Sequence, residues 1–410
     1  MIIPQTPKGF RDFLPSTSLK RKLVLAKIVS VFERFGFDPL ETPAIEFAET
    51  LKGKYGEDEK LIFEFTDRGD RQVALRYDQT VPLSRVVAQY PELPKPFKRY
   101  QTQNVWRAEN PQKGRFREFL QVDFDVVGSS STLVDSEIAQ IISAVLKELG
   151  FKKFRILLNS RPLLNDLMKS SGVDENLVTG AITSIDKLKK IGIDGVIQEM
   201  VGRGIPTEVA KKVIESFQNA KPNQEVQSVL DTLKDSGEDM SSFVFEPTLA
   251  RGLAYYTGII YEAEVEGFSA GSVCGGGRYD KLIGQFSGTD YPANGASFGF
   301  DRVLEAMEEQ GLLPEVKTTT KVLVTIFSKD LVQNSLKVAQ ELKAQGINTE
   351  VYLDTDAKLE KQLKYADAKG IPFAIILGPE EAEKAVVNLK NLSTKEQTQV
   401  PISEVITKLT

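Results

Sequence analysis

A predicted β-hairpin carries polar side chains in a pattern that suits the binding of a charged small molecule. Phe97–Arg107 and Glu118–Val127 are rich in strand-forming residues, and a polar, basic loop from Glu109 to Phe116 joins them. Successive side chains of a strand point to opposite faces, so four residues of the returning strand share one face: Phe119, Gln121, Asp123 and Asp125. An aromatic ring, an amide and carboxylates are poorly suited to a dry core.

The outgoing strand adds a cation to the same region. Arg107 and Glu109 share a face by the same rule, so a guanidinium and a carboxylate would point into one space. The alternative is a solvated hairpin whose strands are joined by ion pairs, and spacing alone favours neither interpretation.

A second group of residues lies in the segment Arg251–Gly258, which reads Arg-Gly-Leu-Ala-Tyr-Tyr-Thr-Gly. The glycines give backbone freedom, while Arg251, Tyr255 and Tyr256 supply one cation and two phenol hydroxyls in a small space. By itself the segment could equally be a turn packed by tyrosines.

Glycines mark a third region. It consists of Gly275-Gly-Gly-Arg-Tyr-Asp280 and of Gly295-Ala-Ser-Phe-Gly-Phe-Asp-Arg302. Glycines on adjacent strands remove side chains where a ligand or another backbone approaches closely. Taken alone, however, the triple glycine favours a β-bulge.

The absence of histidine restricts the possible chemistry. With no imidazole and Cys274 as the single cysteine, Cys/His zinc sites, Ser-His-Asp triads and Cys-His dyads are excluded, and no metal site built from Cys and His is expected. An intramolecular disulfide is excluded as well. Any catalysis must therefore depend on carboxylates, guanidinium groups, tyrosines, backbone amides or a bound ion.

The balance of charges argues against a nucleic-acid binder that works by bulk charge. The chain has 52 Lys and Arg against 57 Asp and Glu, a net charge of −5, although a local basic groove is compatible with this balance. Met1–Thr6 has no basic start followed by a long apolar run, and no window approaches the apolar length of a membrane span. We expect a cytoplasmic protein with no membrane segment.

The length of 410 residues exceeds what one hydrophobic core usually holds. Strand and helix patterns predict an α+β domain formed by residues 1–158 and 243–315, interrupted by a helical insertion at 159–242. Residues 321–410 follow a strand-helix-strand-helix-strand pattern, which predicts an α/β domain with a parallel sheet. This unit lacks Gly-x-Gly-x-x-Gly, so no dinucleotide site is expected there.

Local signals predict several of the elements around these segments. Ser16 or Ser18 can cap a first helix, and Gly36 stands where a glycine would end it. A strand-like run spans Phe37–Thr42, and helical spacing continues through Ile182–Ile191 within the insertion.

The three groups occur together and in an order that resembles the histidyl-tRNA synthetases, a family of class II aminoacyl-tRNA synthetases, along essentially the whole chain. Phe37–Pro43 resembles motif 1 of this class, which lies at the dimer interface. Arg107–Asp125 resembles motif 2, and Gly295–Arg302 resembles motif 3. Arg251–Gly258 and Ser272–Asp280 resemble the histidine-specific signature and the glycine-rich segment that follows it.

The resemblance implies a fold and an activity. A catalytic domain on a mostly antiparallel sheet, with a helical insertion, would precede an α/β anticodon-binding domain at 321–410. The enzyme would activate L-histidine with ATP and Mg²⁺, releasing pyrophosphate, and transfer histidine to the 3′ end of tRNA(His). A homodimer through motif 1, around Pro43, is expected.

The resemblance also implies roles for residues that bind ATP. Arg107 would bind the α-phosphate and the substrate carboxylate, and Arg251 would stabilise the transferring centre. Arg302 would clamp the adenine and the γ-phosphate, Glu109 would accept from the adenine amino group, and Phe119 would stack on the ring. Such chemistry needs positioning and charge compensation rather than a histidine base.

Further roles concern histidine and tRNA. The stretch from Asp78 to Thr80 and Gln121 would hold the α-amino group, while Asp125 and Tyr256 would read the two imidazole nitrogens. Tyr255 and Tyr279 would close the pocket. The residues expected to meet the acceptor end of tRNA are Gln112, Lys113 and Arg115.

One position departs from the family pattern, because Ala254 stands where the signature usually has aspartate. A carboxylate that could orient Arg251 is therefore missing, and either activity is lowered or another acid compensates. The rival assignments are a regulatory subunit of ATP phosphoribosyltransferase, which lacks the anticodon domain, and other class II synthetases. The threonyl enzyme needs absent zinc ligands, and prolyl or glycyl enzymes would not explain Arg251–Tyr256.

Overall fold

The computed structural model describes residues 2–111, 115–251, 255–269 and 271–409. The chain divides into two compact units, residues 1–12 with 24–313 and residues 13–23 with 314–410. The first unit contains an eight-stranded and a three-stranded sheet, and the second contains a five-stranded sheet. The finer division into a two-part catalytic domain, an insertion and a C-terminal domain, with the boundaries given above, remains our proposal.

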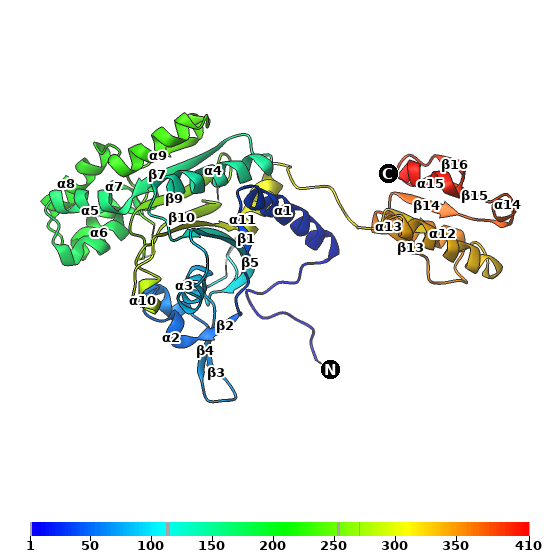
Figure 1. The fold of residues 1–410 in the computed structure, drawn as a ribbon, viewed down its shortest axis with the longest axis horizontal. Coiled ribbons are helices and arrows are strands. Elements are labelled where there is room, and N and C mark those ends of the chain that lie inside the picture. The colour runs from blue at the N-terminus through cyan, green and yellow to red at the C-terminus, as the bar shows by residue number, and fades with distance from the viewer. Residues whose placement is uncertain (1, 112–114, 252–254, 270, 410) are drawn as a thin grey trace. The chain divides into compact units, whose positions relative to one another are not determined.

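An eight-stranded sheet forms the centre of the first unit (Figure 1). Its strands, in spatial order, are β1 (Asp38–Pro39), β5 (Phe97–Trp106), β6 (Glu118–Val127), β11 (Ala293–Gly299), β10 (Cys274–Arg278), β9 (Ile259–Val265), β7 (Phe154–Ser160) and β8 (Phe243–Phe245). The pairs β1–β5 and β7–β8 are parallel, and the other pairs are antiparallel. The predicted mostly antiparallel sheet is confirmed.

Helices cover one face of this sheet with an apolar core. They are α1 (Pro15–Arg34), α4 (Thr132–Glu148), α9 (Gln224–Asp235) and α11 (Phe300–Glu309). Strand β6 shows why this core forms where it does, because Val122, Phe124 and Val126 alternate onto this face and are buried in it. Gln121 and Asp125 consequently point to the other face.

The opposite face is only partly covered by helices. Figure 1 shows α4 and α9 on one side of the sheet and α2, α3 and α10 on the other. The bounds on this second side are α2 (Ala48–Leu51), α3 (Thr80–Gln89) and α10 (Gly284–Ser287). Between β7 and β8 the chain forms α5 (Arg161–Ser170), α6 (Val178–Ile185), α7 (Leu188–Gly202) and α8 (Thr207–Gln218) before α9.

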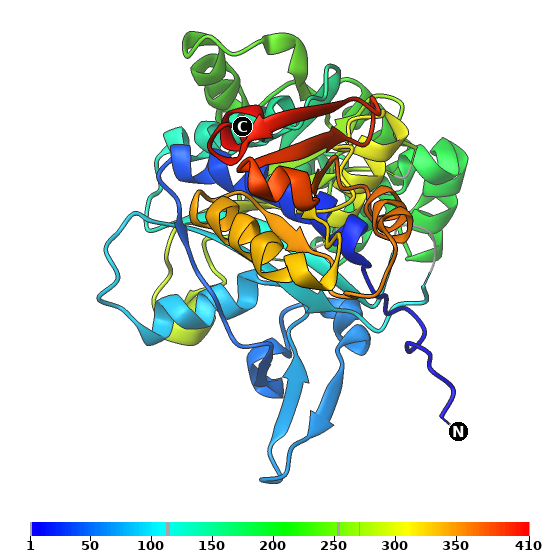
Figure 2. The same cartoon turned by 90° about the vertical axis from the view of Figure 1, so that its right-hand side faces the viewer.

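A small sheet stands beside the large one. It consists of β2 (Ile45–Phe47), β4 (Gln72–Leu75) and β3 (Glu64–Thr66), in the order β2-β4-β3. The β3–β4 hairpin protrudes from the first unit, as Figures 1 and 2 both show. Its turn contains Asp67, whose carboxylate accepts hydrogen bonds from the main-chain N–H groups of Gly69 and Arg71. These two bonds hold the turn between β3 and β4 in place.

The second unit is built on a five-stranded sheet in the order β13-β12-β14-β15-β16. The strands are β12 (Val322–Val324), β13 (Thr349–Val351), β14 (Phe373–Ile376), β15 (Val386–Asn391) and β16 (Gln397–Pro401), and the helices are α12 (Val332–Ala344), α13 (Leu359–Lys369), α14 (Pro379–Glu383) and α15 (Ile402–Leu409). The first three strands are parallel, which confirms the predicted βαβαβ unit. The antiparallel β15 and β16 were not predicted.

Four local predictions are wrong. Helix α1 begins at Pro15, upstream of both serines, because the fixed φ of proline suits the first helical position. The run Phe37–Thr42 contains only the two-residue β1, and the expected helix Ile182–Ile191 is divided between α6 and α7. Gly275–Gly277 form no bulge, since they pair in continuous register with both neighbouring strands.

None of the helices in the part of the chain that the structure describes is long and apolar enough to cross a bilayer.

Candidate active site

The predicted site residues that the structure describes line one cavity of about 680 Å³ in the first unit. They are Asp78, Thr80, Arg107, Glu109, Arg115, Phe119, Gln121, Asp125, Arg251, Tyr255, Tyr256, Tyr279 and Arg302. Gln112, Lys113 and Ala254 lie outside the described residues. Segments far apart in the sequence thus meet in one place, at the face of the sheet that helices leave open.

The floor of the cavity is the polar face of β6. Gln121, Asp123 and Asp125 are 8%, 2% and 3% exposed, so this face is buried rather than solvated. Asp125 forms an ion pair with Arg99 at 2.8 Å, and Arg99 is itself fully buried. The hydroxyl of Tyr279 donates to the same carboxylate. Asp125 is therefore tied to β5 and to the end of β10, and not to Arg115 or Arg117.

Two glycines provide the space that two charged side chains occupy. A Cβ atom on Gly275 would lie 1.6 Å from Nη1 of Arg251, and one on Gly295 would lie 2.1 Å from Oδ1 of Asp125. A side chain at either position would therefore force its charged neighbour to move. The glycine-rich strands are therefore explained by the close approach of site residues rather than by a bulge.

Several buried acceptor atoms have no hydrogen-bond partner within the described structure. Oδ1 of Asp78 accepts from the hydroxyl of Tyr55 at 3.0 Å and from the N–H of Val81 at 3.1 Å, while Oδ2 has none. Oε1 of Gln121 is also without a partner. Both side chains line the cavity, and unpartnered buried acceptors are costly unless a ligand supplies donors. The arrangement suits an ammonium group.

Aromatic hydroxyls enclose the same end of the cavity. The ring centroids of Tyr255 and Tyr256 are 4.9 Å apart, and those of Tyr255 and Tyr279 are 6.0 Å apart. Burial is the largest cause that raises the pKa of each of these three tyrosines, so all three are neutral donors near pH 7.

Arginines also line the cavity. Nε of Arg107 donates to the main-chain oxygen of Tyr77 at 3.2 Å, and its guanidinium lies 5.2 Å from the ring centroid of Phe119. Arg251 pairs with Glu262 at 3.3 Å, and Arg302 donates to the main-chain oxygen of Ser272 at 3.0 Å. Fixed cations in a partly dry cavity bind anions strongly, phosphates above all.

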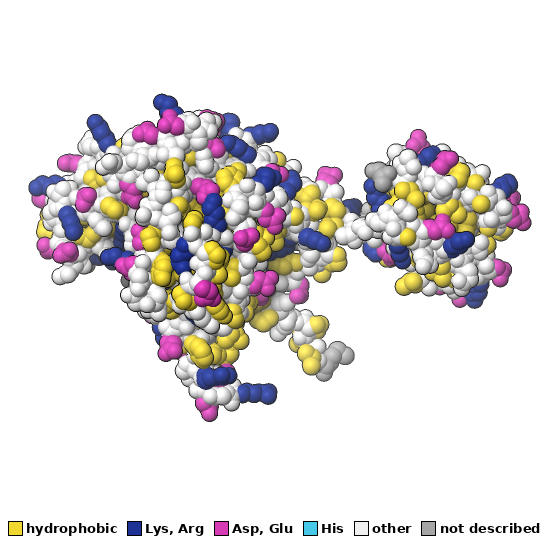
Figure 3. Space-filling view, viewed as in Figure 1, with side chains coloured by type: hydrophobic (Ala, Val, Ile, Leu, Met, Phe, Trp, Pro, Cys, Tyr) yellow, Lys and Arg dark blue, Asp and Glu magenta, His cyan; other side chains and the backbone are white. Residues whose placement is uncertain are grey.

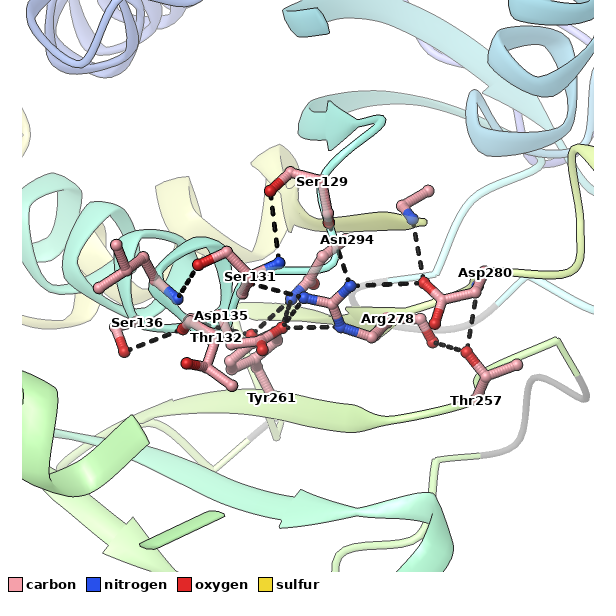
Figure 4. A network of polar contacts seen from close by, with 12 residues as sticks. Ser129, Ser131, Thr132, Asp135, Ser136, Thr257, Tyr261, Arg278, Asp280 and Asn294 are labelled. Carbon is pink, nitrogen blue, oxygen red and sulfur yellow. Dashed lines mark hydrogen bonds and ion pairs between the residues drawn. The ribbon is translucent and has the colours of Figure 1, made fainter. Parts of the chain in front are cut away.

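A buried polar network behind the cavity holds two of its walls in place (Figure 4). Arg278 donates to the carboxylate of Asp135 on α4 at 2.7 Å. The amide of Asn294 on β11 donates to the same carboxylate, and to the hydroxyl of Tyr261 on β9 at 2.8 Å. Arg278 immediately precedes Tyr279, and its main-chain oxygen accepts from the N–H of Thr257 at 2.7 Å. The network thus links the segment of Tyr256 to that of Tyr279.

Three residues close to this site were not assigned a role from the sequence. Arg99 lies opposite Asp125 in the β5–β6 register, so the strand pairing together with charge could have indicated it. Asp123 was placed on the correct face but given no role. Arg11 forms an ion pair with Asp301 at 3.0 Å and lies 3.1 Å from the ring centroid of Phe116, which no local pattern predicts.

The fold and this site together define a class of protein. A mostly antiparallel sheet with a polar hairpin, a glycine-rich strand pair and a helix that carries an arginine in its first turn is the catalytic domain of a class II aminoacyl-tRNA synthetase. The second unit has the α/β form expected of the anticodon-binding domain.

Comparisons with known proteins identify the family. The family model described as Histidyl-tRNA synthetase matches residues 9–303, and the one described as Anticodon binding domain matches residues 321–410. The Histidine--tRNA ligase of Wolinella succinogenes is 40% identical over 97% of this chain and 96% of its own length, and that of Cytophaga hutchinsonii is 38% identical over 99% of each. The chain belongs to the histidyl-tRNA synthetase family.

Solved structures agree with this assignment. A histidyl-tRNA synthetase from a Nostoc species is 32% identical to this chain, with a TM-score of 0.88. The match covers 100% of this chain and 99% of the Nostoc chain. A Bacillus halodurans structure titled ATP phosphoribosyltransferase regulatory subunit/histidyl-tRNA synthetase has a TM-score of 0.76. The match covers 89% of this chain and 97% of the other. At 20% identity that second likeness shows the fold alone.

Proposed function

We propose that this protein is a histidine–tRNA ligase, which activates L-histidine with ATP to histidyl-adenylate and pyrophosphate and transfers histidine to the 3′ end of tRNA(His). The observation that carries the proposal is the meeting of three arginines with Asp78, Gln121 and the tyrosines of the histidine-type signature in one cavity. The attacking group in activation is a carboxylate, already an anion, so a chain without histidine can perform the reaction.

The three arginines would bind ATP. Arg107 would contact the α-phosphate and the substrate carboxylate, Arg251 would stabilise charge at the transferring phosphorus, and Arg302 would hold the adenine and the γ-phosphate. Glu109, which now pairs with Arg115 at 3.4 Å, would accept from the adenine amino group while Phe119 stacks on the ring. Fixed donors aimed at developing charge need no reorganisation during the reaction.

The buried acceptors and the tyrosines would bind histidine. Asp78, with Thr80 beside it, and Gln121 would hold the α-ammonium group, for which their unpartnered oxygens are suited. Asp125 would accept from one imidazole nitrogen, since a carboxylate offers about four lone-pair positions and its contacts to Arg99 and Tyr279 leave some unused. Tyr256 would contact the other nitrogen, and Tyr255 and Tyr279 would close the pocket.

Mg²⁺ would enter with ATP. Among the described residues no group of three or more His, Cys, Asp or Glu side chains could hold a metal ion. Mg²⁺ usually retains phosphate and water ligands and needs only one or two carboxylates.

The experiment that tests the proposal is ATP–pyrophosphate exchange measured with each standard amino acid. Exchange should depend on L-histidine and on Mg²⁺, and chelation of the metal should abolish it. Equal exchange with proline or glycine, or exchange with no amino acid present, would contradict the proposed substrate.

The N-terminal segment supports the ATP end of the site and leads to a prediction. Arg11 contacts both Asp301 on α11 and the ring of Phe116 in the motif 2 loop. Next to it, the main-chain oxygen of Gly9 accepts from the main-chain N–H of Arg117 at 2.9 Å. Arg11→Ala should raise the KM for ATP about tenfold, the usual effect of losing a charged hydrogen bond. The KM for histidine should change less than twofold, and Arg11→Lys should recover part of the loss. Equal changes in both constants would point to a general structural defect.

Transfer to tRNA would use both units. Arg115, with Gln112 and Lys113 nearby in the sequence, would meet the acceptor end, and residues 321–410 would bind the anticodon, as the matching family model suggests. Basic residues need to line only one face, so a net charge of −5 is compatible with RNA binding.

Removal of residues 321–410 tests this division of labour. Histidine-dependent exchange should stay within about threefold, because the cavity lies entirely in the first unit. Charging of tRNA should fall by at least about tenfold, equivalent to about 1.4 kcal/mol of lost binding. Equal loss of both activities in a truncated protein that is still folded by circular dichroism would contradict the division.

We also propose a homodimer formed through motif 1 around Pro43. Ile45, Phe47 and Phe65 on the small sheet are 46%, 51% and 41% exposed, and hydrophobic side chains gather in that part of the first unit in Figure 3. Large exposed apolar patches often mark association sites. A cytoplasmic location stays a prediction.

A further inference from the structure

Gln121 is held by two partners that use both hydrogens of its amide. Its Nε2 donates to Oγ of Ser297 on β11 at 2.8 Å and to Oδ1 of Asp123 on the same strand at 3.3 Å. Its Oε1 is buried and has no partner among the described residues. The amide therefore presents only an acceptor to the cavity.

The chemistry of Asp123 determines this orientation. An ionised carboxylate accepts hydrogen bonds and donates none, so the amide group beside it must turn its NH₂ toward it. Ser297 can donate or accept and imposes no direction by itself. If Gln121 were reversed, two acceptors would face each other and the NH₂ would point at the ammonium group of the substrate.

We propose that Asp123 is a positioning residue for histidine binding: it holds the amide of Gln121 with its oxygen toward the α-ammonium group, and protonation of Asp123 releases that orientation. The inference rests on the proposed function, since it concerns the same amino-acid site. It gives a role to Asp123, which had none in the proposed function, and it predicts that histidine binding depends on pH.

The surroundings of Asp123 favour such a switch near neutral pH. Burial raises the pKa of Asp123 to about 7, Arg99 lowers it, and the charges of Asp125 and Asp78 raise it. A hydrogen bond from Ser297 favours the ionised form. The other titratable or charged groups that act on it from neighbouring elements are Arg76, Tyr255 and Cys274.

The sign of the effect follows from the two states of the carboxyl group. Above pH 7 Asp123 is ionised, Gln121 presents its oxygen, and the ammonium group is bound. Below pH 7 the carboxylic acid can donate to Oε1 of Gln121, so the amide can reverse and histidine binds more weakly. The imidazole of the substrate titrates at about pH 6.5 and adds its own dependence, so a control that removes only the Asp123 contribution is required.

Asp123→Asn is that control. Asparagine cannot titrate, and its NH₂ group can donate to Oε1 of Gln121 as the protonated acid would. At pH 8 the KM for histidine in this variant should therefore be about tenfold above that of the unmodified protein. Between pH 8 and pH 6 the ratio of the two KM values should fall toward one, because only the unmodified protein loses the orientation. A ratio that stays constant across this range would overturn the inference.

Asp123→Leu and Gln121→Met test whether Asp123 acts through Gln121. Each should raise the KM for histidine about tenfold at pH 8, with the KM for ATP within twofold. The double variant should be no worse than Gln121→Met alone, because Asp123 has nothing left to orient. Multiplied effects would mean that Asp123 contacts the substrate directly, and parallel changes in both KM values would indicate a structural role.

The outcomes separate this inference from the proposed function. If the unmodified protein shows no histidine-dependent exchange, the proposed function is wrong and the inference falls with it. If exchange is normal and Asp123→Leu has no effect on the KM for histidine, only the inference is wrong. Should Asp123→Leu fail to fold, the pH profile of Asp123→Asn still decides the question.

Discussion

Arg251→Ala is expected to slow histidine-dependent exchange by about 100- to 1,000-fold, the usual effect of removing one fixed donor aimed at transition-state charge. Burial by itself lowers the pKa of Arg251, but the nearby Tyr256 phenol and Glu262 carboxylate raise it more. The pKa is therefore raised overall, and the side chain is charged throughout the working range. The loss should appear in kcat more than in either KM, since the charge that Arg251 compensates grows during the reaction.

The fold should survive this substitution. Arg251 pairs with Glu262, whose side chain is 25% exposed, so the carboxylate left behind can be hydrated at little cost. The main-chain N–H of Arg251 donates to Asp186 at 3.1 Å, and alanine retains that contact. An unchanged melting temperature with exchange reduced by two orders of magnitude would support the role. Normal turnover would exclude it, and unfolding would make the residue structural.

Gly275→Ala provides a matched test of the same side chain without altering it. The added Cβ would lie 1.6 Å from Nη1 of Arg251, so the guanidinium must move. Exchange should fall in the same way as in Arg251→Ala, and combining the two substitutions should add little, because both remove one interaction.

Asp125→Asn is expected to raise the KM for histidine about 10- to 100-fold, which corresponds to the value of a hydrogen bond between a charged acceptor and a ring donor. Asparagine keeps the size of the side chain but replaces one acceptor oxygen with NH₂, which cannot accept from the imidazole N–H. The KM for ATP should change less than threefold in exchange assays. An unchanged KM for histidine would remove Asp125 from the site.

The alanine variant at this position is a poor choice, for a reason that the structure supplies. Arg99 is fully buried and its ion pair with Asp125 spans 2.8 Å. Removing one partner of a buried pair leaves an uncompensated charge and typically costs about 3–5 kcal/mol of stability. Asp125→Asn also removes the carboxylate charge, but its carbonyl oxygen can still accept a hydrogen bond from Arg99. Both variants should therefore lower the melting temperature, Asp125→Ala by more, so a change in the KM of the alanine variant would not report on recognition alone.

Much of the fold could be predicted because it depends on local patterns. The bounds of β6 agree with the prediction, and the βαβαβ order of the second unit follows from alternating periodicities. Helix α4 and strands β15 and β16 were not predicted, although α4 has a clear start in the Ser131 side chain, which accepts from the N–H of Leu133 at 3.2 Å. The triple glycine of β10 led to the wrong prediction of a bulge, because glycine is rare in regular strands.

The sequence predicted the residues that line the cavity better than the residues that contact them. Strand alternation alone placed Gln121, Asp123 and Asp125 on one face, and the resemblance indicated that Arg251 and Arg302 would join them; the cavity contains all five. The roles assigned to them await the experiments above. Arg99 and Arg11 were absent from the predicted site, since each reaches it from a segment with no distinguishing motif.

The sequence by itself determined which side chains share a face, which chemistry is impossible without histidine, and which family the motifs resemble. These properties follow from covalent geometry and composition, which need no knowledge of distant segments. The tertiary structure decided that Asp125 pairs with Arg99, that Gly275 and Gly295 make room for Arg251 and Asp125, and that Asp123 faces the amide of Gln121. Each of these depends on how strands pair and which side chains share a buried volume, and burial is what makes an unmatched charge or an extra methyl group costly.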